Sequence, residues 1–516
     1  MKKKVRSLYC SHVTDQPLPP PGVPPTGWHI SISPQEQVLL NVVKNTLVHF
    51  NLKTVPRIAG GWVRDKLLNK DCHDIDIALD DCSGEEFANK VNEYLASTGQ
   101  EVKTVGVIKA NPDQSKHLAT ATVRIHHSDI DFVNLRSETY ETHSRIPKIE
   151  IGTPEQDAYR RDFTVNSMFY NVLSEQVEDL TKMGLEDLEN GVLRTPLDAL
   201  QTFSDDPLRM LRAVRFSARY GFSLEESLCK SLFDVNNGLA LATKISHERV
   251  GVEIDKMLRG PLPKLALKML VHHKLCDAVF KVPMERFIDL TSDKLLTPGR
   301  VDWINGLRIV DRIQERSEFN TTPLYLAGLL FPLGTSTFQQ GKKREYAAKH
   351  VCFANLKLGS YTSDRCFTII TASLELIPFL LRSSSMEDRL LLGRILFEVK
   401  DCWRDGLIVA IAALEAGRAF SKDHDLFCQQ VKQRAEVLEH CIEHEWDLDL
   451  IWDRLQKDPV LDGKELMSLL KIKGAEVRRA VILVREFCFL NSILREDERD
   501  LFVERCKRHV LEQWTK

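Results

Sequence analysis

Two aspartates stand two positions apart in a short run of alternating acidic and apolar residues. Residues 73–79 read HDIDIAL. Successive side chains of a β-strand point to opposite faces, so a strand here places Asp74 and Asp76 on one face and Ile75 and Ile77 on the other. Two carboxylates on one rigid edge are suitable ligands for Mg²⁺. The run predicts a metal-binding strand; a half-exposed strand with ordinary acids on its wet side is the alternative.

A second acidic run lies further along the chain. Residues 129–136 read DIDFVNLR, so a strand here places Asp129 and Asp131 on one face. Either acid can complete a site of three carboxylates and two metal ions, and the other is then a surface residue. Two metals about 3.5–4 Å apart activate an attacking hydroxyl and stabilise the leaving oxygen of an in-line displacement at phosphorus. The two acidic runs together predict nucleotidyl transfer.

A glycine pair precedes the first acidic run. Residues 57–65 read RIAGGWVRD, and we expect a strand that ends at Gly60 and Gly61 and a helix that continues through Leu68. Glycines let the backbone approach a phosphate closely, and the N-terminus of a helix directs unpaired N–H groups toward it. A glycine pair alone is equally typical of a tight turn, so the phosphate-binding interpretation depends on the acids that follow.

Two further motifs combine arginine with aspartate. Residues 160–166 read RRDFTVN, a set able to hold triphosphate oxygens and ribose hydroxyls, with an exposed, charged helix start as the alternative. In residues 205–209, DDPLR, one acid is the N-cap of a helix that begins with proline. Asp206 and Arg209 share a helix face, where the carboxylate can accept from an exocyclic amine and the guanidinium can donate to a ring nitrogen. Cytosine and adenine both offer that pair; uracil and guanine do not.

The bulk composition excludes several classes of protein. The chain has 516 residues, of which 43% are apolar, and a net charge of −3, so it is globular and does not coat nucleic acid by bulk charge. Its 12 cysteines form no Cys-x-x-Cys pair, which argues against a zinc ribbon or a disulfide scaffold. The most apolar stretch, residues 367–381, contains Glu375 and Pro378 and is shorter than a membrane span, so we predict a buried helix and no membrane partner.

The elements that position these motifs change character along the chain. Residues 1–32 are a basic, proline-rich leader, and its lysines and few serines make a poor mitochondrial address. A helical run from Ser33 followed by short apolar strands predicts an α/β domain over residues 33–180. After Thr202 the apolar residues recur at three-to-four spacing, which predicts helices to the end of the chain.

In matching order from Val55 to Pro263, the motifs resemble the eukaryotic tRNA nucleotidyltransferase family. These motifs are GGWVRD, HDIDIAL, RRDFTVN, GLEDLENGVLRTP, DDPLRMLRAVRF and SHERVGVEIDKML. The family comprises the CCA-adding enzymes of the second, poly(A)-polymerase-like class. The resemblance implies an α+β protein: a nucleotidyltransferase head over residues 33–180, an all-helical neck over 181–262, and a helical body and tail over 263–516 that bind tRNA.

The resemblance also implies a role for each motif residue. The metal ligands are Asp74 and Asp76, with Asp131 as third catalytic carboxylate. The triphosphate is held by Gly60, Gly61 and Arg64, and the sugar and phosphates by Arg160, Arg161 and Asp162. The amino-acid template for CTP and ATP is formed by Asp206 and Arg209, with support from Asp205, Arg212, Glu248 and Arg249. Mg²⁺ is the expected cofactor, and tRNA, CTP and ATP are the expected partners.

Two departures from the family pattern leave the extent of the reaction open. Ala119 stands where relatives usually carry glutamate, and Met183 replaces a usually basic residue. The family's loop near residues 105–120 and its hinge-like segment near 180–188 are associated with switching from C to A addition. An enzyme that adds only CC, or only the terminal A, beside a partner enzyme is therefore an alternative.

Two other classes of function are alternatives to a CCA-adding enzyme. A catalytically silent tRNA-binding or export factor would need no metal-binding pair, and Asp74 and Asp76 argue against it. A poly(A) polymerase would favour ATP alone, which the Asp206–Arg209 pair argues against. The basic run Lys342, Lys343 and Arg344 is a candidate tRNA contact or a plain exposed turn. The expected location is the cytoplasm, with mitochondria and nucleus also open, and the oligomeric state is left undetermined.

Overall fold

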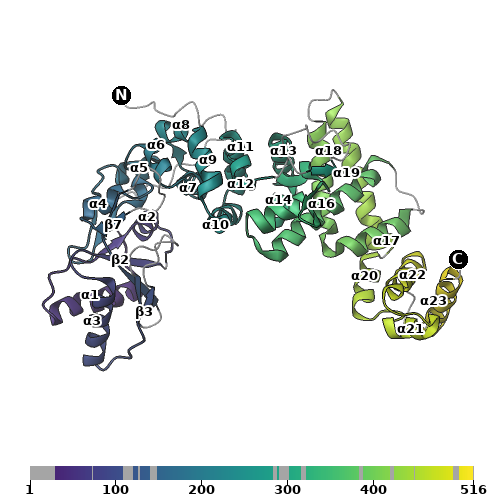
Figure 1. Ribbon diagram of the computed structural model, residues 1–516, viewed down its shortest axis with the longest axis horizontal. Helices are drawn as coiled ribbons and strands as arrows, with labels where there is room; N and C mark the ends of the chain where they lie inside the picture. The colour runs from purple at the N-terminus through teal and green to yellow at the C-terminus, as the bar shows by residue number, and fades with distance from the viewer. Residues whose placement is uncertain are drawn as a thin grey trace. The chain divides into compact units, whose positions relative to one another are not determined.

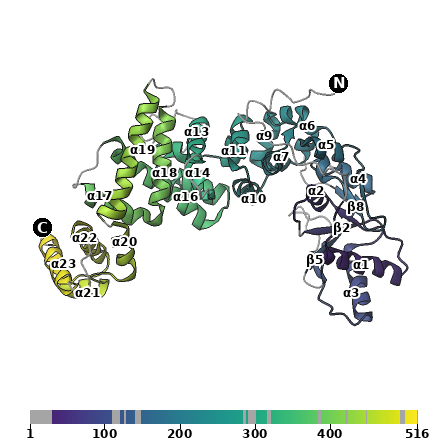
Figure 2. The same cartoon turned by 180° about the vertical axis from the view of Figure 1, so that it is seen from behind.

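The chain forms two compact units, Met1–Val279 and Phe280–Lys516, drawn in Figures 1 and 2. The computed structural model describes residues 30–72, 74–108, 120–125, 128–139, 148–282, 287–289, 301–314, 321–382, 388–418, 423–446, 448–491 and 499–514. The leader over residues 1–29 and Ala119 lie outside the described residues. The division into head, neck, body and tail stays a prediction.

A seven-stranded mixed sheet organises the first unit. Its strands are β1 (Arg57–Ala59), β2 (Ile75–Leu79), β3 (Gly106–Ile108), β4 (Thr120–Ile125), β5 (Ser128–Asn134), β8 (Phe169–Asn171) and β9 (Gln176–Glu178). They lie in the order β3-β4-β5-β2-β1-β8-β9, and only β2 and β5 run parallel. Both predicted acidic runs are therefore strands, and they are neighbours at the centre of this sheet.

Two helices cover part of the sheet and lie side by side in both views (Figures 1 and 2). Helix α1 (Pro34–His49) begins at the predicted place because Ser33 and Glu36 form a capping box. Helix α3 (Gly84–Ser97) packs on β4 and β5, with the rings of Phe87 and Phe132 5.0 Å apart. Helix α3 buries its apolar residues against these strands, and α1 packs on α3, with Val38 and Val48 left exposed.

Shorter elements complete the first unit. Beside the sheet lie α2 (Gly61–Leu67), the β6–β7 hairpin (Arg136–Thr139 and Lys148–Ile151), α4 (Pro154–Tyr159), the 3₁₀ turn η2 (Thr164–Asn166) and α5 (Gly184–Asn190). The helices that follow are α6 (Ala199–Asp205), α7 (Leu208–Tyr220), α8 (Glu226–Ser231), α9 (Val235–Lys244), α10 (His247–Leu258), α11 (Pro263–His272) and α12 (Cys276–Phe280). Strand β10 (Val192–Leu193) precedes α6 and α7, and β11 (Ser223–Leu224) follows α7. The two strands pair in parallel over two residues.

The second unit is mostly helical, as the sequence predicts. Its helices are α13 (Trp303–Gln314), α14 (Thr322–Leu330), α15 (Ala347–His350), α16 (Gly359–Leu381), α17 (Asp388–Val399), α18 (Trp403–Gly417), α19 (His424–His440), α20 (Leu448–Lys457), α21 (Gly463–Leu470), α22 (Ala475–Asn491) and α23 (Arg499–Trp514), with the short turns η4 (Phe331–Leu333), η5 (Val351–Asn355), η6 (Lys400–Cys402) and η7 (Cys441–Glu445). The predicted buried helix of residues 367–381 is the second half of α16, and Glu375 and Pro378 both face outward. No helix among the described residues combines the length and apolar character that crossing a bilayer requires.

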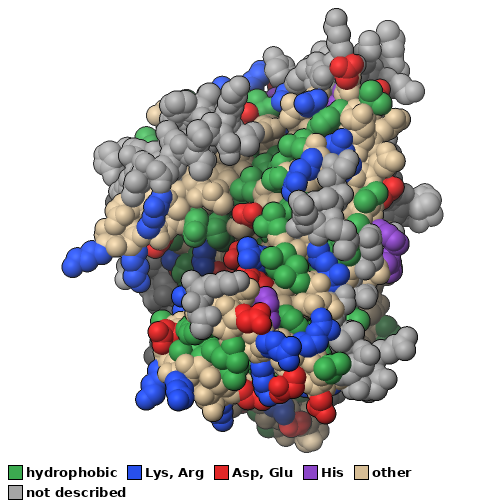
Figure 3. Space-filling view, turned by 90° about the vertical axis from the view of Figure 1, so that its right-hand side faces the viewer, with side chains coloured by type: hydrophobic (Ala, Val, Ile, Leu, Met, Phe, Trp, Pro, Cys, Tyr) green, Lys and Arg blue, Asp and Glu red, His purple; other side chains and the backbone are tan. Residues whose placement is uncertain are grey.

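A small sheet in the second unit differs from the predicted run of helices. Strands β12 (Phe287–Asp289), β13 (Thr337–Gln340) and β14 (Lys343–Tyr346) form it, and the exposed basic run Lys342 to Arg344 is the tip and edge of the β13–β14 hairpin. Strands of four residues are too short to show a period of two in the sequence. On the face drawn in Figure 3, acidic and basic side chains are interspersed, so the low net charge reflects local mixing there.

Candidate functional site

The first acidic run is brought beside the second by the parallel pairing of β2 with β5. Asp76 lies directly opposite Asp131 in the register, and Asp74 immediately precedes β2. Thr122 on β4 donates a hydrogen bond of 2.5 Å to Asp131, which fixes that carboxylate. Burial among protein atoms, and then the neighbouring Asp131, raise the pKa of Asp76 above its ordinary value. Repulsion between these carboxylates is the condition that a bound cation would relieve.

Asp129, the other acid of the second run, has a different environment. Its side chain is 59% exposed, and Arg124 on β4 lies 3.8 Å from its carboxylate. An exposed acid with a basic neighbour is an ordinary surface residue. Of the two alternatives that the sequence left open, the geometry favours Asp131 as the third carboxylate.

The donors at this edge fit a hard divalent cation. Asp74 and Asp76 are exposed carboxylates, and neither forms an ion pair with another described residue. Among the described residues no three His, Cys, Asp or Glu side chains converge tightly enough to hold an ion alone. Mg²⁺ characteristically takes one or two carboxylates and completes its shell with substrate phosphates and water. The arrangement therefore fits an ion that binds together with a nucleotide.

The glycine pair forms the predicted turn from β1 into α2. Gly60 has φ 67° and ψ −109°, a conformation that residues with a side chain rarely adopt. A Cβ atom at Gly60 would lie 2.6 Å from Nη1 of Arg161 and 3.1 Å from the carbonyl oxygen of Asn166. The glycine is therefore required by its backbone angles and by the guanidinium that lies over it.

Replacing Gly60 with alanine should destabilise the first unit by about 1–3 kcal/mol, the usual cost of a strained backbone conformation, with an added clash against Asn166. Gly99 is the matched control, since its φ is 72° and a Cβ there would meet no atom within 4 Å. Urea denaturation of both variants measures the difference. Equal losses in Gly60→Ala and Gly99→Ala would show that the close approach at Gly60 costs nothing.

Arg64, which the resemblance assigns to the triphosphate, is engaged by protein groups in this structure. Its guanidinium is buried, bonds Asp65 at 2.8 Å and also donates to Asn166. The same group lies over the rings of Phe216 and Tyr220, 5.0 and 4.6 Å from their centroids. In this geometry Arg64 joins α2 to α7, and its role toward a triphosphate stays a prediction.

No role was predicted for Asp65, which follows Arg64 in the same motif. It is buried and accepts a hydrogen bond of 2.7 Å from the hydroxyl of Tyr220, while Arg219 lies 3.6 Å from its other oxygen. Burial raises the pKa of Tyr220, so the phenol stays protonated and donates this bond. The motif GGWVRD thus supplies a carboxylate that anchors the end of α7.

Asp157 organises the two arginines of the RRD motif. The carboxylate is 1% exposed and accepts from Arg160 at 2.7 Å, from Arg161 at 2.8 Å and from the backbone N–H of Arg136 at 2.9 Å. Burial alone would raise the pKa of Asp157, but Arg161 and Arg160 lower it below its ordinary value. Spacings of three and four residues from the arginines were the available signal for this pairing, because such positions adjoin on a helix. Arg160 also binds Glu138 at 2.8 Å.

The lowered pKa of Asp157 predicts acid lability. Because the folded-state pKa lies below the unfolded value of about 3.9, the ionised carboxylate stabilises the fold above that pH, and this contribution is lost as pH falls through the folded-state pKa. The stability difference between the wild type and Asp157→Asn should therefore be large at pH 7 and shrink below about pH 4. Thermal unfolding between pH 7 and 3 measures it, with Asp255→Asn on α10 as an exposed control. A difference that does not depend on pH would contradict the assignment.

Asp162 is fully engaged by the protein. Its carboxylate is 8% exposed and accepts from Arg212 at 2.6 Å, from Asn166 at 2.9 Å and from the backbone N–H of Phe163 at 2.9 Å. Burial would raise the pKa of Asp162, but Arg212 and Asn166 lower it. The predicted nucleotide ligand is thus a brace between the 3₁₀ turn η2 and helix α7, and contact with a nucleotide stays a prediction.

Arg209 lies in the first turn of α7, but Asp206 precedes the helix as the C-cap of α6. The two therefore do not share a helix face as predicted, because the helix begins at Leu208 after Pro207. Asp206 precedes the helix in an extended conformation, accepts from the backbone N–H of Leu208 at 3.1 Å and pairs with Arg249 at 2.9 Å. Arg209 donates to the carbonyl oxygen of Arg160 at 2.8 Å. Both side chains are half-exposed and keep unused hydrogen-bonding capacity. The predicted support by Arg249 is seen directly.

The other residues predicted to support Asp206 and Arg209 differ in their contacts. Arg212 is held by Asp162 and lies 4.0 Å from Glu253 of α10. Asp205 ends α6 and accepts from Gln201 at 2.6 Å. Glu248 is exposed on the first turn of α10 and forms no ion pair with another described residue. Glu253 was missed, because its partner Arg215 lies 38 positions away in sequence.

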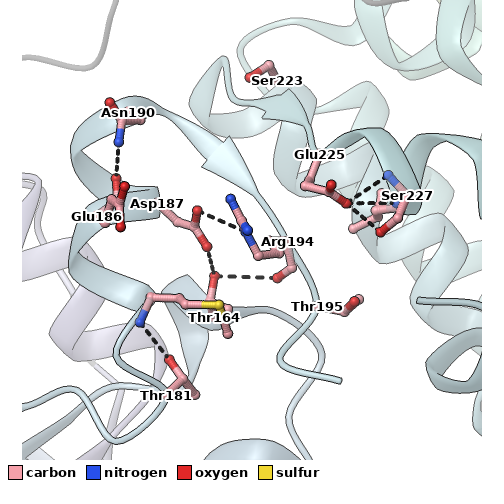
Figure 4. A network of polar contacts seen from close by, with 12 residues as sticks. Thr164, Thr181, Glu186, Asp187, Asn190, Arg194, Thr195, Ser223, Glu225 and Ser227 are labelled. Carbon is pink, nitrogen blue, oxygen red and sulfur yellow. Dashed lines mark hydrogen bonds and ion pairs between the residues drawn. The ribbon is translucent and has the colours of Figure 1, made fainter. Parts of the chain in front are cut away.

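Met183 lies in a tightly bonded turn before α5. Its backbone N–H donates to Thr181 at 3.4 Å, and its side chain is half-exposed. Figure 4 shows the adjoining network, in which Asp187 accepts from Thr164 at 2.6 Å and from Arg194 at 3.2 Å. These bonds connect the sheet side of the segment with the strand that follows α5. These hydrogen bonds hold the segment in this conformation, and its role as a hinge stays a prediction.

The fold and site together define a nucleotidyltransferase head of the poly(A) polymerase type. Residues 56–194 match the family model described as "Poly A polymerase head domain", and residues 221–285 match "Probable RNA and SrmB- binding site of polymerase A". The chain is 32% identical to the tRNA nucleotidyltransferase cca2 of Schizosaccharomyces pombe, covering 86% of this chain and 92% of that one. The chain therefore belongs to the tRNA nucleotidyltransferase family. Divalent-metal use is general among nucleotidyltransferases of this kind.

Other proteins match the chain over part of its length in sequence or over most of its length in fold. The chain is 47% identical to the mitochondrial CCA tRNA nucleotidyltransferase of Saccharomyces cerevisiae over 49% of this chain and 48% of that one, so it spans about half the length of that relative. The CCA-adding enzyme of Bacillus stearothermophilus in complex with CTP shares the fold, with a TM-score of 0.57, 20% identity, and coverage of 93% of this chain and 100% of that one. The tRNA-bound CCA-adding enzyme of Thermotoga maritima gives a TM-score of 0.54 at 19% identity, covering 94% and 96%.

Proposed function

We propose that the protein adds C and A nucleotides to the 3′ end of tRNA from CTP and ATP without a nucleic-acid template. The supporting observation is the register of Asp76 opposite Asp131, in the same unit as a start of α7 that Arg249 holds. Membership of the family and the printed names of its members support the choice of tRNA. A protein that only bound tRNA would have no use for adjacent, mutually repelling carboxylates.

Asp74 and Asp76 are the proposed ligands of Mg²⁺, with Asp131 as the third catalytic carboxylate. When bound, the ion neutralises charge on the reacting phosphate and the attacking oxygen. Thr122 holds the carboxylate of Asp131 in place through its 2.5 Å hydrogen bond. The protein atoms that surround part of Asp76 lower the local dielectric constant and so strengthen the electrostatic interactions at the edge, while the side chain still reaches solvent.

Nucleotide choice is proposed to rest on Asp206 and Arg209. Asp206 accepts from the exocyclic amine of cytosine or adenine, and Arg209 donates to the adjacent ring nitrogen. Arg249 and the carbonyl of Arg160 restrain the two side chains before a nucleotide arrives, which lowers the entropic cost of selection. Uracil and guanine lack the matching donor and acceptor pair.

The decisive experiment supplies purified protein with Mg²⁺, CTP and ATP and with tRNA transcripts that lack CCA, lack CA or lack A. Products are resolved at single-nucleotide length. Growth of the shortest transcript by CCA supports the full activity, and omission of CTP should stop it. No extension of any transcript in the presence of Mg²⁺ would overturn the proposal.

A partial enzyme is the second candidate function. The departures at Ala119 and Met183 support it. So does the contrast between two matched tRNA nucleotidyltransferases of Schizosaccharomyces pombe, since cca2 is matched over 92% of its length and cca1 over 47%. A halt after CC, or A addition only to the transcript that lacks A, would favour this candidate. After a halt at CC, the partner enzyme must add the terminal A. After A addition alone, the partner enzyme must add CC.

The remaining assignments follow from the same proposal. Residues 33–180 are the catalytic head, 181–262 the neck that selects nucleotides, and 263–516 the body and tail that bind tRNA. Two yeast relatives named mitochondrial support a mitochondrial share of the protein beside a cytoplasmic one. A reporter fused to residues 1–32 tests this location, since a reporter that stays outside mitochondria would exclude the leader as an address.

A further inference from the structure

The arginines predicted to hold the nucleotide's phosphates, and Arg212, which was predicted to support the site, are already paired with carboxylates of the protein. Each guanidinium has an acidic partner at 2.6–2.8 Å. The pairs are Arg64 with Asp65, Arg160 with Asp157 and Glu138, Arg161 with Asp157, and Arg212 with Asp162. A guanidinium in a close carboxylate pair has fewer free N–H groups and less net charge to offer a polyphosphate. The predicted set by itself is therefore a weak binder of triphosphate.

Arg136 is different from these four. Within the described part of the chain it forms no ion pair, and its Nε is buried without a hydrogen-bond partner. Burial, and then the nearby Arg160, lower the pKa of Arg136 below its ordinary value. A buried N–H without an acceptor is costly, and Arg136 is only partly buried as a whole, so its unpartnered Nε is available to an anion that arrives from outside.

The backbone of Arg136 is held firmly just beyond the end of β5. Arg136 begins β6, directly after β5, the strand that carries Asp131. Its N–H donates to Asp157 at 2.9 Å, and it pairs with Ile151 in the β6–β7 hairpin. Gly152 packs so closely on it that a Cβ there would lie 2.5 Å from the carbonyl carbon of Arg136. The guanidinium is thus attached to a rigid segment.

Arg136 belongs to a cluster of charges beside the glycine turn. Its backbone N–H and the guanidinium of Arg161 share the carboxylate of Asp157, and Nη1 of Arg161 lies over Gly60. Arg136, Arg160 and Arg161 place three positive charges around Asp157 and Glu138, which leaves one positive charge in excess. A cation in excess beside the proposed phosphate-binding turn is placed to meet the outer phosphates of a bound nucleotide.

We propose that Arg136 binds the β- and γ-phosphates of the incoming nucleoside triphosphate and stabilises the departing pyrophosphate. The inference rests on the proposed nucleotidyl transfer. In that step the 3′ oxygen of the RNA forms a bond to the α-phosphorus, and its proton passes to solvent. The bond from the α-phosphorus to the bridging oxygen breaks, and pyrophosphate leaves with the electron pair. The planar guanidinium can donate two parallel hydrogen bonds to these oxygens.

The test compares Arg136→Ala, Arg136→Lys and Arg124→Ala in the full-length protein. Arg124 is the control because it is an exposed arginine on the same sheet whose ion-pair partner among the described residues is the exposed Asp129. Inhibition of nucleotide addition by Mg²⁺-pyrophosphate and the thermal shift that this salt induces are the readouts. Arg136→Ala should lower the affinity for pyrophosphate, and that for ATP and CTP, by about tenfold or more. This is the usual effect of losing a charge-assisted bidentate contact. Arg136→Lys should recover part of this, and the KM for tRNA should change less than about twofold.

Stability separates this role from a structural one. Removal of an unpaired guanidinium that repels Arg160 and Arg161 should leave the Tm without ligand unchanged or raise it. A lowered Tm with unchanged affinity for pyrophosphate would overturn the inference. Wild-type protein that extends tRNA while Arg136→Ala binds pyrophosphate normally would leave the proposed function standing and remove the inference. If wild-type protein extends no tRNA, but its thermal shift with pyrophosphate is abolished in Arg136→Ala, the proposed function falls and Arg136 remains a phosphate-binding residue.

Discussion

Asp76→Asn should lower the rate of nucleotide addition at least about a thousandfold while the protein stays folded. The expectation follows from the loss of a charged metal ligand, which removes several kcal/mol of transition-state stabilisation at about 1.4 kcal/mol per factor of ten. The amide is nearly isosteric with the carboxylate. It also removes the repulsion from Asp131, which together with the larger effect of burial raises the pKa of the Asp76 carboxyl group. The Tm should therefore be unchanged or higher. Single-turnover extension of tRNA at saturating CTP measures the rate.

Asp129→Asn is the matched control for this prediction. Asp129 lies on the same strand as Asp131, is 59% exposed and faces Arg124. Its replacement should change the rate less than about twofold, whereas Asp131→Asn should behave like Asp76→Asn. Equal, large losses at Asp129 and Asp131 would mean that the catalytic edge extends further along β5 than we infer. Full activity of Asp76→Asn would refute the two-carboxylate site.

Glu253→Ala should destabilise the first unit by about 3–5 kcal/mol, the usual cost of leaving a buried charge without its partner. Arg215 on α7 donates to Glu253 on α10 at 2.6 Å, and both residues are buried, 6% and 4% exposed. The loss also frees Arg212, whose guanidinium lies 4.0 Å from the same carboxylate. Because α7 begins beside Asp206 and Arg209, the selection of CTP and ATP over UTP should deteriorate as well. Hydrogen exchange of the α7 and α10 amides locates the effect.

Two comparisons test the cause of that loss. Asp255→Ala, which breaks the exposed pair with Arg259 on the same helix, should cost no more than about 0.5 kcal/mol. The double variant Arg215→Met with Glu253→Leu should recover most of the stability, since apolar residues of similar size leave no buried charge. A double variant as unstable as Glu253→Ala would show that shape, and not the unpaired charge, is responsible.

Local chemistry made several elements predictable. The start of α1 follows from Ser33 and Glu36, which are three residues apart and cap the helix. The turn at Gly60 follows from a glycine pair between a short apolar strand and a helix, and β2 follows from the alternation of residues 74–79. Each signal lies within a few residues, where spacing fixes which side chains share a face.

Pairing over long distances in sequence was not predictable. Arg64, expected at the triphosphate, is held by Asp65, which in turn accepts from Tyr220, 155 positions away. Asp162, expected at the nucleotide, braces Arg212 across 50 positions. Hairpin β13–β14 escaped notice because its strands are four residues each. None of these contacts leaves a periodic trace, because periodicity records only neighbours along one element.

The sequence by itself determined the class of chemistry, because paired acids, the glycine turn and the DDPLR helix start are recognisable from residue type and spacing. It also determined the two-part organisation, a mixed sheet followed by helices. Only the tertiary structure decided which charges are free to meet a substrate. The parallel pairing of β2 with β5 sets Asp76 against Asp131 and leaves Asp129 to solvent. Ion pairs between elements remote in sequence neutralise Arg64, Arg160, Arg161 and Arg212 but not Arg136, since each pairing depends on packing that no local pattern encodes.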